Sequence, residues 1–248
     1  MGGVDDPIDI PDHGGVSRPS VRLGAIGEGW GLFQDQWGVW MLTAGLALVC
    51  NAGVLSLASS LFDIDPPFRM GGFRMPVWSG GGATSMAVTM AVNGFFLGGM
   101  MRMACRQVRG RKVTVGDLFS VVDVLPNLIL GALIYGLASM IGFMCLFIPG
   151  LIVSAVFLFT IPLIVDGGLG ATEAMARSWE ALRSEIVSAT VFHVVVSLVA
   201  GVGSCLCCVG LLLTAPLYSL SIAVLYRDFF LTKGASYGGK PKAPSSDF

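Results

Sequence analysis

The chain has 248 residues, of which 12% are charged and 54% are hydrophobic, and its mean hydropathy is +0.77. A soluble domain carries about 25% charged residues, so this composition excludes a soluble globular protein. The net charge of -1 provides no broad basic face for phosphates, which excludes a nucleic-acid binder. We therefore expect an all-α fold, a polytopic membrane helical bundle.

Uncharged runs between charged residues predict the number of spans. Runs of 27 residues follow Asp35 and Arg74, and runs of 42 and 41 residues follow Asp123 and Glu185. About 20 helical residues cross a hydrocarbon core of about 30 Å. Each short run therefore holds one span, and each long run must fold back once and hold two. The six predicted spans cover roughly residues 38–61, 83–104, 125–146, 150–166, 185–204 and 209–230.

The spans define one membrane domain, residues 24–231, between two predicted disordered tails. The first tail, residues 1–23, is rich in acidic residues, glycine and proline, and it lacks the basic start and apolar run of a signal peptide. The second tail covers residues 232–248.

Three segments outside the spans are expected to be amphipathic helices at the cytoplasmic membrane interface: 26–37, 114–122 and 171–185. The first places aromatic side chains at helical spacing, and the second begins with Thr114 and Asp117, which resemble a capping box. Such helices lie with their apolar face toward the lipid.

Three polar residues fall at membrane depth and form a candidate polar site. Asn51 and Asn93 lie in the first two spans, and His193 lies in the fifth. Intramembrane ionisable groups are often functional. The alternative for His193 is a neutral side chain that hydrogen-bonds to a neighbouring helix.

A basic cluster follows the second span and contains five cations within 11 residues. Such a cluster is expected to contact anionic lipids, at about 1 kcal/mol for each cation near the surface. It serves equally well as a simple orientation signal. Its members are Arg102, Arg106, Arg109, Arg111 and Lys112.

Small residues recur four apart in the second and third spans, as Gly94 with Gly98 and as Ala132 with Gly136. Such pairs allow helices to approach closely. The contact can form within the bundle or between protomers.

Two fold-back points are predicted within the long runs. The first is Ile148-Pro149-Gly150, because proline and glycine interrupt a helix readily. The second lies within residues 201–210. Both are expected at the outer face, where cysteines also gather. We therefore expect one disulfide between Cys145 and one of Cys205, Cys207 and Cys208, with free thiols packed in the interior as the alternative.

Basic residues indicate the orientation. With a cytoplasmic N-terminus, 13 of the 15 lysines and arginines fall on the inner side and the remaining two, Arg69 and Arg74, fall outside. Both termini are therefore predicted to be cytoplasmic.

The second half resembles a known group of proteins. The segments that carry the resemblance are Ile148-Pro-Gly-Leu-Ile152, Pro162-Leu-Ile-Val-Asp166, Gly167 to Trp179 and Leu225-Tyr-Arg227, with Arg109 to Phe119 upstream. They are similar to bacterial six-helix membrane proteins that include the membrane domain of some glycerophosphoryl diester phosphodiesterases. The resemblance covers roughly residues 24–231 and implies a six-helix bundle in the bacterial inner membrane. It implies no phosphodiesterase activity, because that activity belongs to a soluble catalytic barrel that this chain lacks.

Motifs of catalysis are not found. The cysteine spacing is not a standard zinc pattern, the glycine-rich stretch 80–82 lacks the lysine of a nucleotide-binding loop, and there is no Ser/His/Asp set. No catalytic, cofactor-binding or metal-binding residue is therefore predicted, and the chain is not expected to be an enzyme.

Two functions remain. The leading hypothesis is a scaffold or accessory subunit that docks a membrane-protein partner or a second copy of the chain. The alternative is a transporter or lipid-handling protein, in which Pro162 within the fourth span breaks a helix at a binding site.

Overall fold

The computed structural model describes residues 20–62, 82–145, 147–205 and 207–231. Within these ranges the regular elements are helices, and six helical segments are long and apolar enough to cross a membrane. The chain is thus a multi-pass membrane protein with an all-α fold, as the sequence predicts.

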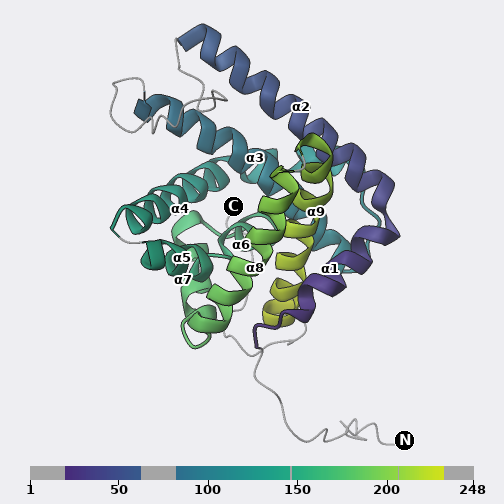
Figure 1. Cartoon of the computed structure of the whole chain (residues 1–248), viewed down its shortest axis with the longest axis vertical. Coiled ribbons are helices and arrows are strands. Elements are labelled where there is room, and N and C mark those ends of the chain that lie inside the picture. The colour runs from purple at the N-terminus through teal and green to yellow at the C-terminus, as the bar shows by residue number, and fades with distance from the viewer. Residues whose placement is uncertain (1–19, 63–81, 146, 206, 232–248) are drawn as a thin grey trace, which may run out of the picture.

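The six spans lie close to the predicted ranges. α3 packs against α2, α4, α6, α9 and the short helix η1, and Figure 1 shows α3 and α9 crossing the middle of the bundle. The fourth span is divided into two helices. In chain order the spans are α2 (Trp37–Phe62), α3 (Gly82–Val108), α4 (Leu125–Cys145), α5 (Phe147–Val156) with α6 (Thr160–Val165), α8 (Ile186–Cys205) and α9 (Cys207–Tyr226), which η2 (Arg227–Leu231) extends.

The three segments expected outside the spans are helical. They are α1 (Gly24–Asp35), the 3-10 helix η1 (Val115–Val124) and α7 (Ala171–Leu182). The predicted capping box at the start of η1 is present: the Thr114 backbone N–H donates to Asp117 Oδ2 at 2.8 Å, and the Thr114 side chain faces the Asp117 backbone N–H.

The fourth span is interrupted before Pro162, where the transporter hypothesis places a broken helix, but the break does not line the pocket described below. Residues 157–159 form a turn between α5 and α6, three residues before Pro162. A proline inside a helix removes one N–H donor, and its ring clashes with the carbonyl four residues earlier. Ser178 of α7 supplies replacement hydrogen bonds here, since its hydroxyl donates to the Val156 carbonyl at 2.7 Å and accepts from the Phe159 N–H at 3.1 Å.

One fold-back point differs from the prediction. α4 ends at Cys145 and α5 begins at Phe147, so the chain turns before Pro149 and Gly150 rather than at them. Proline is tolerated in the first turn of a helix, where its missing N–H has no intrahelical partner in any case. Gly150 instead permits close packing, because a Cβ on Gly142 would lie 2.9 Å from the Gly150 Cα. The second fold-back lies between Cys205 and Cys207, inside its predicted range.

The two small-residue pairs face each other inside the chain. A Cβ on Gly94 would lie 2.7 Å from the Ala132 Cβ, and a Cβ on Gly136 would lie 2.7 Å from the end of the Met90 side chain. Gly98 lies against Leu128 in the same register. The pairs therefore join α3 to α4 within the bundle, which decides between the two predicted uses.

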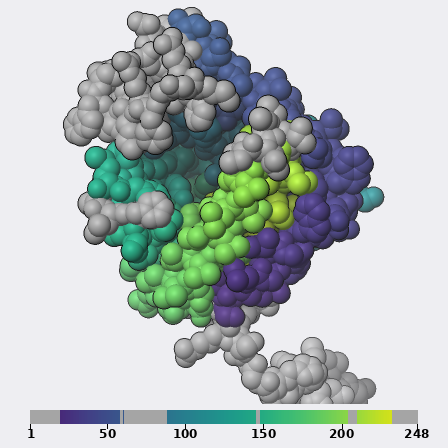
Figure 2. Space-filling view, viewed as in Figure 1, coloured from purple at the N-terminus to yellow at the C-terminus, as the bar shows by residue number. Residues whose placement is uncertain are grey.

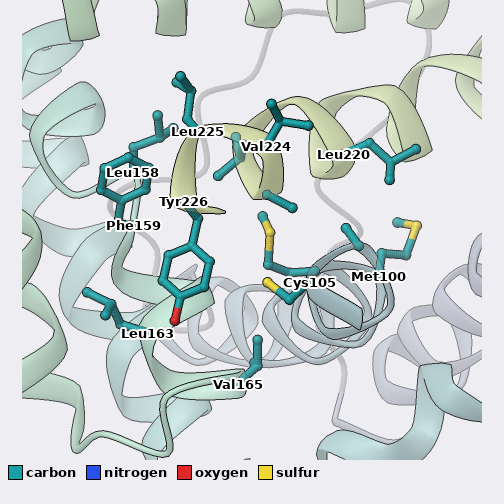
Figure 3. Close-up of a cluster of buried hydrophobic side chains, with 14 of the residues drawn as sticks. Met100, Cys105, Leu158, Phe159, Leu163, Val165, Leu220, Val224, Leu225 and Tyr226 are labelled. Carbon is teal, nitrogen blue, oxygen red and sulfur yellow. The ribbon is translucent and has the colours of Figure 1, made fainter. Parts of the chain in front are cut away.

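The largest buried cluster joins α3, the broken fourth span and α9. Figure 3 shows Tyr226 of α9 pointing toward Leu163 and Val165 of α6, beside Cys105 of α3. Phe159 packs on the Tyr226 ring with a centroid separation of 6.4 Å. α4 and α8 do not pack closely in the same way, and Figure 2 shows a hollow on the surface between them.

Candidate functional site

The first candidate site begins with two asparagines on neighbouring spans. Asn51 of α2 and Asn93 of α3 belong to the predicted polar site, and the structure brings them together: Asn51 Nδ2 donates to Asn93 Oδ1 at 2.6 Å. The two helices pack against each other along this stretch. A direct amide pair therefore forms between two membrane spans.

The amide pair lines a cavity of about 230 Å³ between α2, α3 and α9. Three alanines, Ala44 and Ala47 of α2 and Ala215 of α9, leave space there between the helices. The remaining wall is aliphatic and aromatic. The lining residues are Ala44, Ala47, Leu48 and Asn51 of α2, Asn93, Phe96, Leu97 and Met100 of α3, and Leu211, Leu212 and Ala215 of α9. We call this cavity the α2/α3/α9 pocket.

The amide pair leaves one buried polar atom without a partner in the described structure. Asn51 Oδ1 is buried, and among the described residues it has no hydrogen-bond partner. A side-chain amide offers two donor hydrogens and a carbonyl acceptor. One bond between two amides therefore engages one amino group and one carbonyl, and leaves the other carbonyl and the other amino group without a partner. This remainder is the same whichever way the two amides are turned.

His193, the third member of the predicted polar site, does not line the α2/α3/α9 pocket. It lies buried on α8, and within the described part of the chain its Nδ1 has no hydrogen-bond partner. The structure thus joins two of the three predicted polar residues and leaves the third apart.

The second candidate site is a layer of ion pairs where the spans end, which we call the charged end. Two arginines of α3 and Arg109, just after its end, reach three different acidic residues there. Arg102 forms a two-point contact with Asp123, with nitrogen–oxygen distances of 2.6 and 2.8 Å. Arg106 pairs with Asp117, and Arg109 pairs with Asp166.

Asp166 is the most enclosed carboxylate of this layer, with 8% of its side chain exposed. Besides Arg109, it interacts electrostatically with the nearby Tyr226 hydroxyl. Burying a carboxylate is costly unless it is paired and hydrogen-bonded. The pairing with Arg109 therefore allows Asp166 to lie at the edge of the buried cluster.

A four-residue network joins the beginning of α1 to η2 at the charged end. Arg22 donates to Asp228 at 2.8 Å and to Glu28 at 2.9 Å, and Arg227 pairs with both Glu28 and Asp228. The hydrogen bond from Arg227 lowers the pKa of the Glu28 carboxyl below its usual range, partial burial opposes this shift, and Arg22 adds to it. Glu28 is therefore held in its charged form by two cations.

The predicted lipid-binding cluster is divided by these pairs. Arg102, Arg106 and Arg109 are engaged by carboxylates of this chain, whereas Arg111 and Lys112 are exposed in the segment that follows α3. The contact with anionic lipids stays a prediction. Of the five cations, Arg111 and Lys112 are the ones best placed to make it, because they are exposed.

Gln107 was not among the predicted site residues. Its Oε1 accepts from the Trp40 indole at 2.7 Å, and its Nε2 donates to the Leu32 carbonyl at 2.6 Å, so it ties α3 to the junction of α1 and α2. The sequence offers one indication of this role, because Gln107 is a neutral polar residue among the arginines of α3.

The predicted disulfide lies outside what the structure describes, because the side chains of Cys145, Cys205, Cys207 and Cys208 are not among the described ones. The four residues lie at the ends of α4, α8 and α9. Within the described residues, no group of three or more His, Cys, Asp and Glu side chains is placed to hold a metal ion.

Comparison with protein-family models, curated proteins and solved structures gave no match to this chain. The resemblance to bacterial six-helix membrane proteins therefore remains an expectation. The structure itself supports the helical fold with six candidate spans.

Proposed function

We propose that this multi-pass membrane protein handles lipids, and that it takes the apolar part of a membrane lipid into the α2/α3/α9 pocket. The pocket carries the proposal, because its wall is apolar apart from two amides and its volume is about 230 Å³. An apolar cavity of about 150 Å³ is large enough to hold benzene. The pocket favours lipid handling over the scaffold hypothesis, since it offers a place for an apolar ligand that the sequence alone did not locate.

The proposal includes an orientation and a membrane. We place the charged end and both termini in the cytoplasm, because 13 of 15 basic residues fall on that side of the predicted topology. The bacterial inner membrane follows from the family resemblance. The proposal also keeps the expectation that the chain is not an enzyme.

The test compares two substitutions of alanine on the same helix. Ala47 lines the pocket and is buried, whereas Ala52 is exposed on α2. Wild type, Ala47→Phe and Ala52→Phe are purified in a mild detergent, and everything retained is identified by mass spectrometry. We expect wild type and Ala52→Phe to retain one lipid enriched over the bulk membrane lipids, and Ala47→Phe to lose it.

The same preparations test the scaffold hypothesis. A protein partner at fixed stoichiometry, with no enriched lipid, would contradict lipid handling and support the scaffold. Gel filtration and thermal unfolding show whether Ala47→Phe is folded. Leu48→Phe provides a second pocket-filling variant, since Leu48 is only half-buried.

A further inference from the structure

The α2/α3/α9 pocket is open at one end and closed at the other. On α3 the lining residues pass from the exposed Asn93 through the half-buried Leu97 to the buried Met100. On α2 they pass from the half-buried Asn51, which bonds to Asn93, to the buried Ala44. The open end therefore lies at the amide pair, and the closed end faces the charged end of the bundle.

A hydrogen bond between α2 and α3 seals the closed end. Trp40 lies four residues before Ala44 on α2, and Gln107 lies seven residues after Met100 on α3, so each continues the face of its helix that lines the pocket. The Trp40 indole donates to Gln107 Oε1 at 2.7 Å, and both side chains are buried. A ligand must therefore enter and leave past the amide pair.

The open end lies deep in the membrane. Arg102, where the charged end begins on α3, is nine residues from Asn93, which corresponds to about 14 Å of helix. Half of a hydrocarbon core measures about 15 Å. A charged headgroup is unfavourable at this depth, so the part of a lipid that meets the open end is its hydrocarbon chain.

The size and shape of the pocket fit one such chain. The lining covers residues 44–51 of α2 and 93–100 of α3, which is about 10 Å along each helix. Benzene, with six carbons, occupies an apolar cavity of about 150 Å³, so the pocket volume of about 230 Å³ corresponds to about nine carbons. Nine carbons spread over this length form a single chain rather than a compact ring system.

We infer that the pocket receives the methyl end of one lipid chain, and that Met100 and Ala44 at the closed end determine which chain length fits. The inference rests on the proposed function and names the part of the lipid that is recognised. A chain that is too short leaves a void, whose lining loses dispersion contacts. A chain that is too long meets the sealed end and overpacks it.

The experiment uses a series of phosphatidylcholines that differ only in the length of one chain, by a single carbon at each step. The full-length protein is reconstituted into nanodiscs that contain an equimolar mixture of the series. It is then extracted in a mild detergent, and the retained lipids are quantified by mass spectrometry against the bulk mixture. Because the headgroup is the same throughout, any enrichment reports the chain alone.

We expect wild type to retain one chain length about fivefold over the member one carbon shorter, which leaves a methyl-sized void. Met100→Ala removes three heavy atoms and should move this optimum about three carbons longer, whereas Ala44→Leu adds three and should move it about three carbons shorter. Met101→Ala and Ala52→Leu are the matched controls and should leave the optimum in place. Met101 is buried but does not line the pocket, and Ala52 is exposed on α2.

Two other outcomes are distinct from each other. The first is retention that Ala47→Phe abolishes but that shows no preferred length, or an optimum that the closed-end variants move no further than their controls do. It would overturn the inference while lipid handling stands. No retention by wild type, or retention that Ala47→Phe leaves unchanged, would overturn both. Ala44→Leu keeps the test decisive if Met100→Ala does not fold.

Discussion

Ser178 shows how a single hydroxyl can support a broken membrane span. It is fully buried, and it bonds to a carbonyl and an N–H on either side of the break between α5 and α6. Backbone groups in a membrane must be satisfied inside the protein, because no water is present to replace a missing partner. The serine of a neighbouring helix therefore makes the turn at residues 157–159 tolerable.

We expect Ser178→Ala to lower the free energy of unfolding by about 1–3 kcal/mol, since it leaves a buried N–H and a buried carbonyl without their side-chain partner. Equilibrium unfolding in mixed micelles measures this change. Ser184→Ala is the matched control, because Ser184 is exposed beyond the end of α7. Equal stability of the two variants would contradict a supporting role for the hydroxyl.

At the scale of the helices, α3 packs unusually close to the backbone of η1. Gly99 lies against the η1 backbone, and a β carbon there would overlap the Leu118 carbonyl. A backbone carbonyl cannot move aside as the end of a flexible side chain can. The contact between α3 and η1 therefore requires glycine at this position.

Gly99→Ala is expected to destabilise the bundle by about 1–3 kcal/mol through overpacking. Gly53→Ala is its control, because a β carbon on Gly53 of α2 would have open space within 4 Å. Alanine favours a helix over glycine by about 1 kcal/mol, so the control variant should be equally or more stable than wild type. Thermal unfolding of both variants decides the matter, and a Gly99→Ala midpoint at or above that of Gly53→Ala would refute the requirement.

The helices themselves were largely predictable, because charged residues bound each span and the length of each uncharged run limits how many spans it holds. Pro149 was misread, since a proline after a turn and a proline at the turn look alike in a sequence. The effect of Pro162 was predictable, because it lies well inside an apolar run. The partner that stabilises the break was not, since Ser178 lies 19 residues from Phe159 and no local pattern joins them.

At the scale of the whole molecule, the charged end closes the bundle through pairs that are distant in sequence. The basic residues that indicate the orientation predict where arginines gather, but not which carboxylates they pair with. The α2/α3/α9 pocket was equally hidden. The two asparagines were identifiable as polar residues at membrane depth, whereas the space beside them depends on how α2 and α9 place their alanines against α3.

The closure of the bundle should depend on pH through Glu28. Its folded-state pKa is lowered, so its pairing stabilises the protein above the usual carboxyl pKa, and this stabilisation is lost as the pH falls through the lowered value. At pH 7 we expect Glu28→Gln to unfold about 2–4 °C below wild type, in keeping with partly exposed ion pairs. The difference should shrink as the pH falls below the usual carboxyl pKa.

Thermal scans of both proteins from neutral pH to pH of about 3 measure this difference. Glu180→Gln serves as the control, because Glu180 is exposed on α7. A difference between wild type and Glu28→Gln that stays constant over the whole range would show that the charge of Glu28 is not its cause.

The pairing of Arg22 with Asp228 also constrains how the protein is made. The two residues are 206 positions apart, and synthesis proceeds from the N-terminus. Helix α1 can therefore reach its final partners only after the last span has left the ribosome and entered the bilayer. A chain that stops before Arg227 leaves Arg22 and Glu28 without these partners at the membrane surface. This difference distinguishes an incomplete molecule from a complete one.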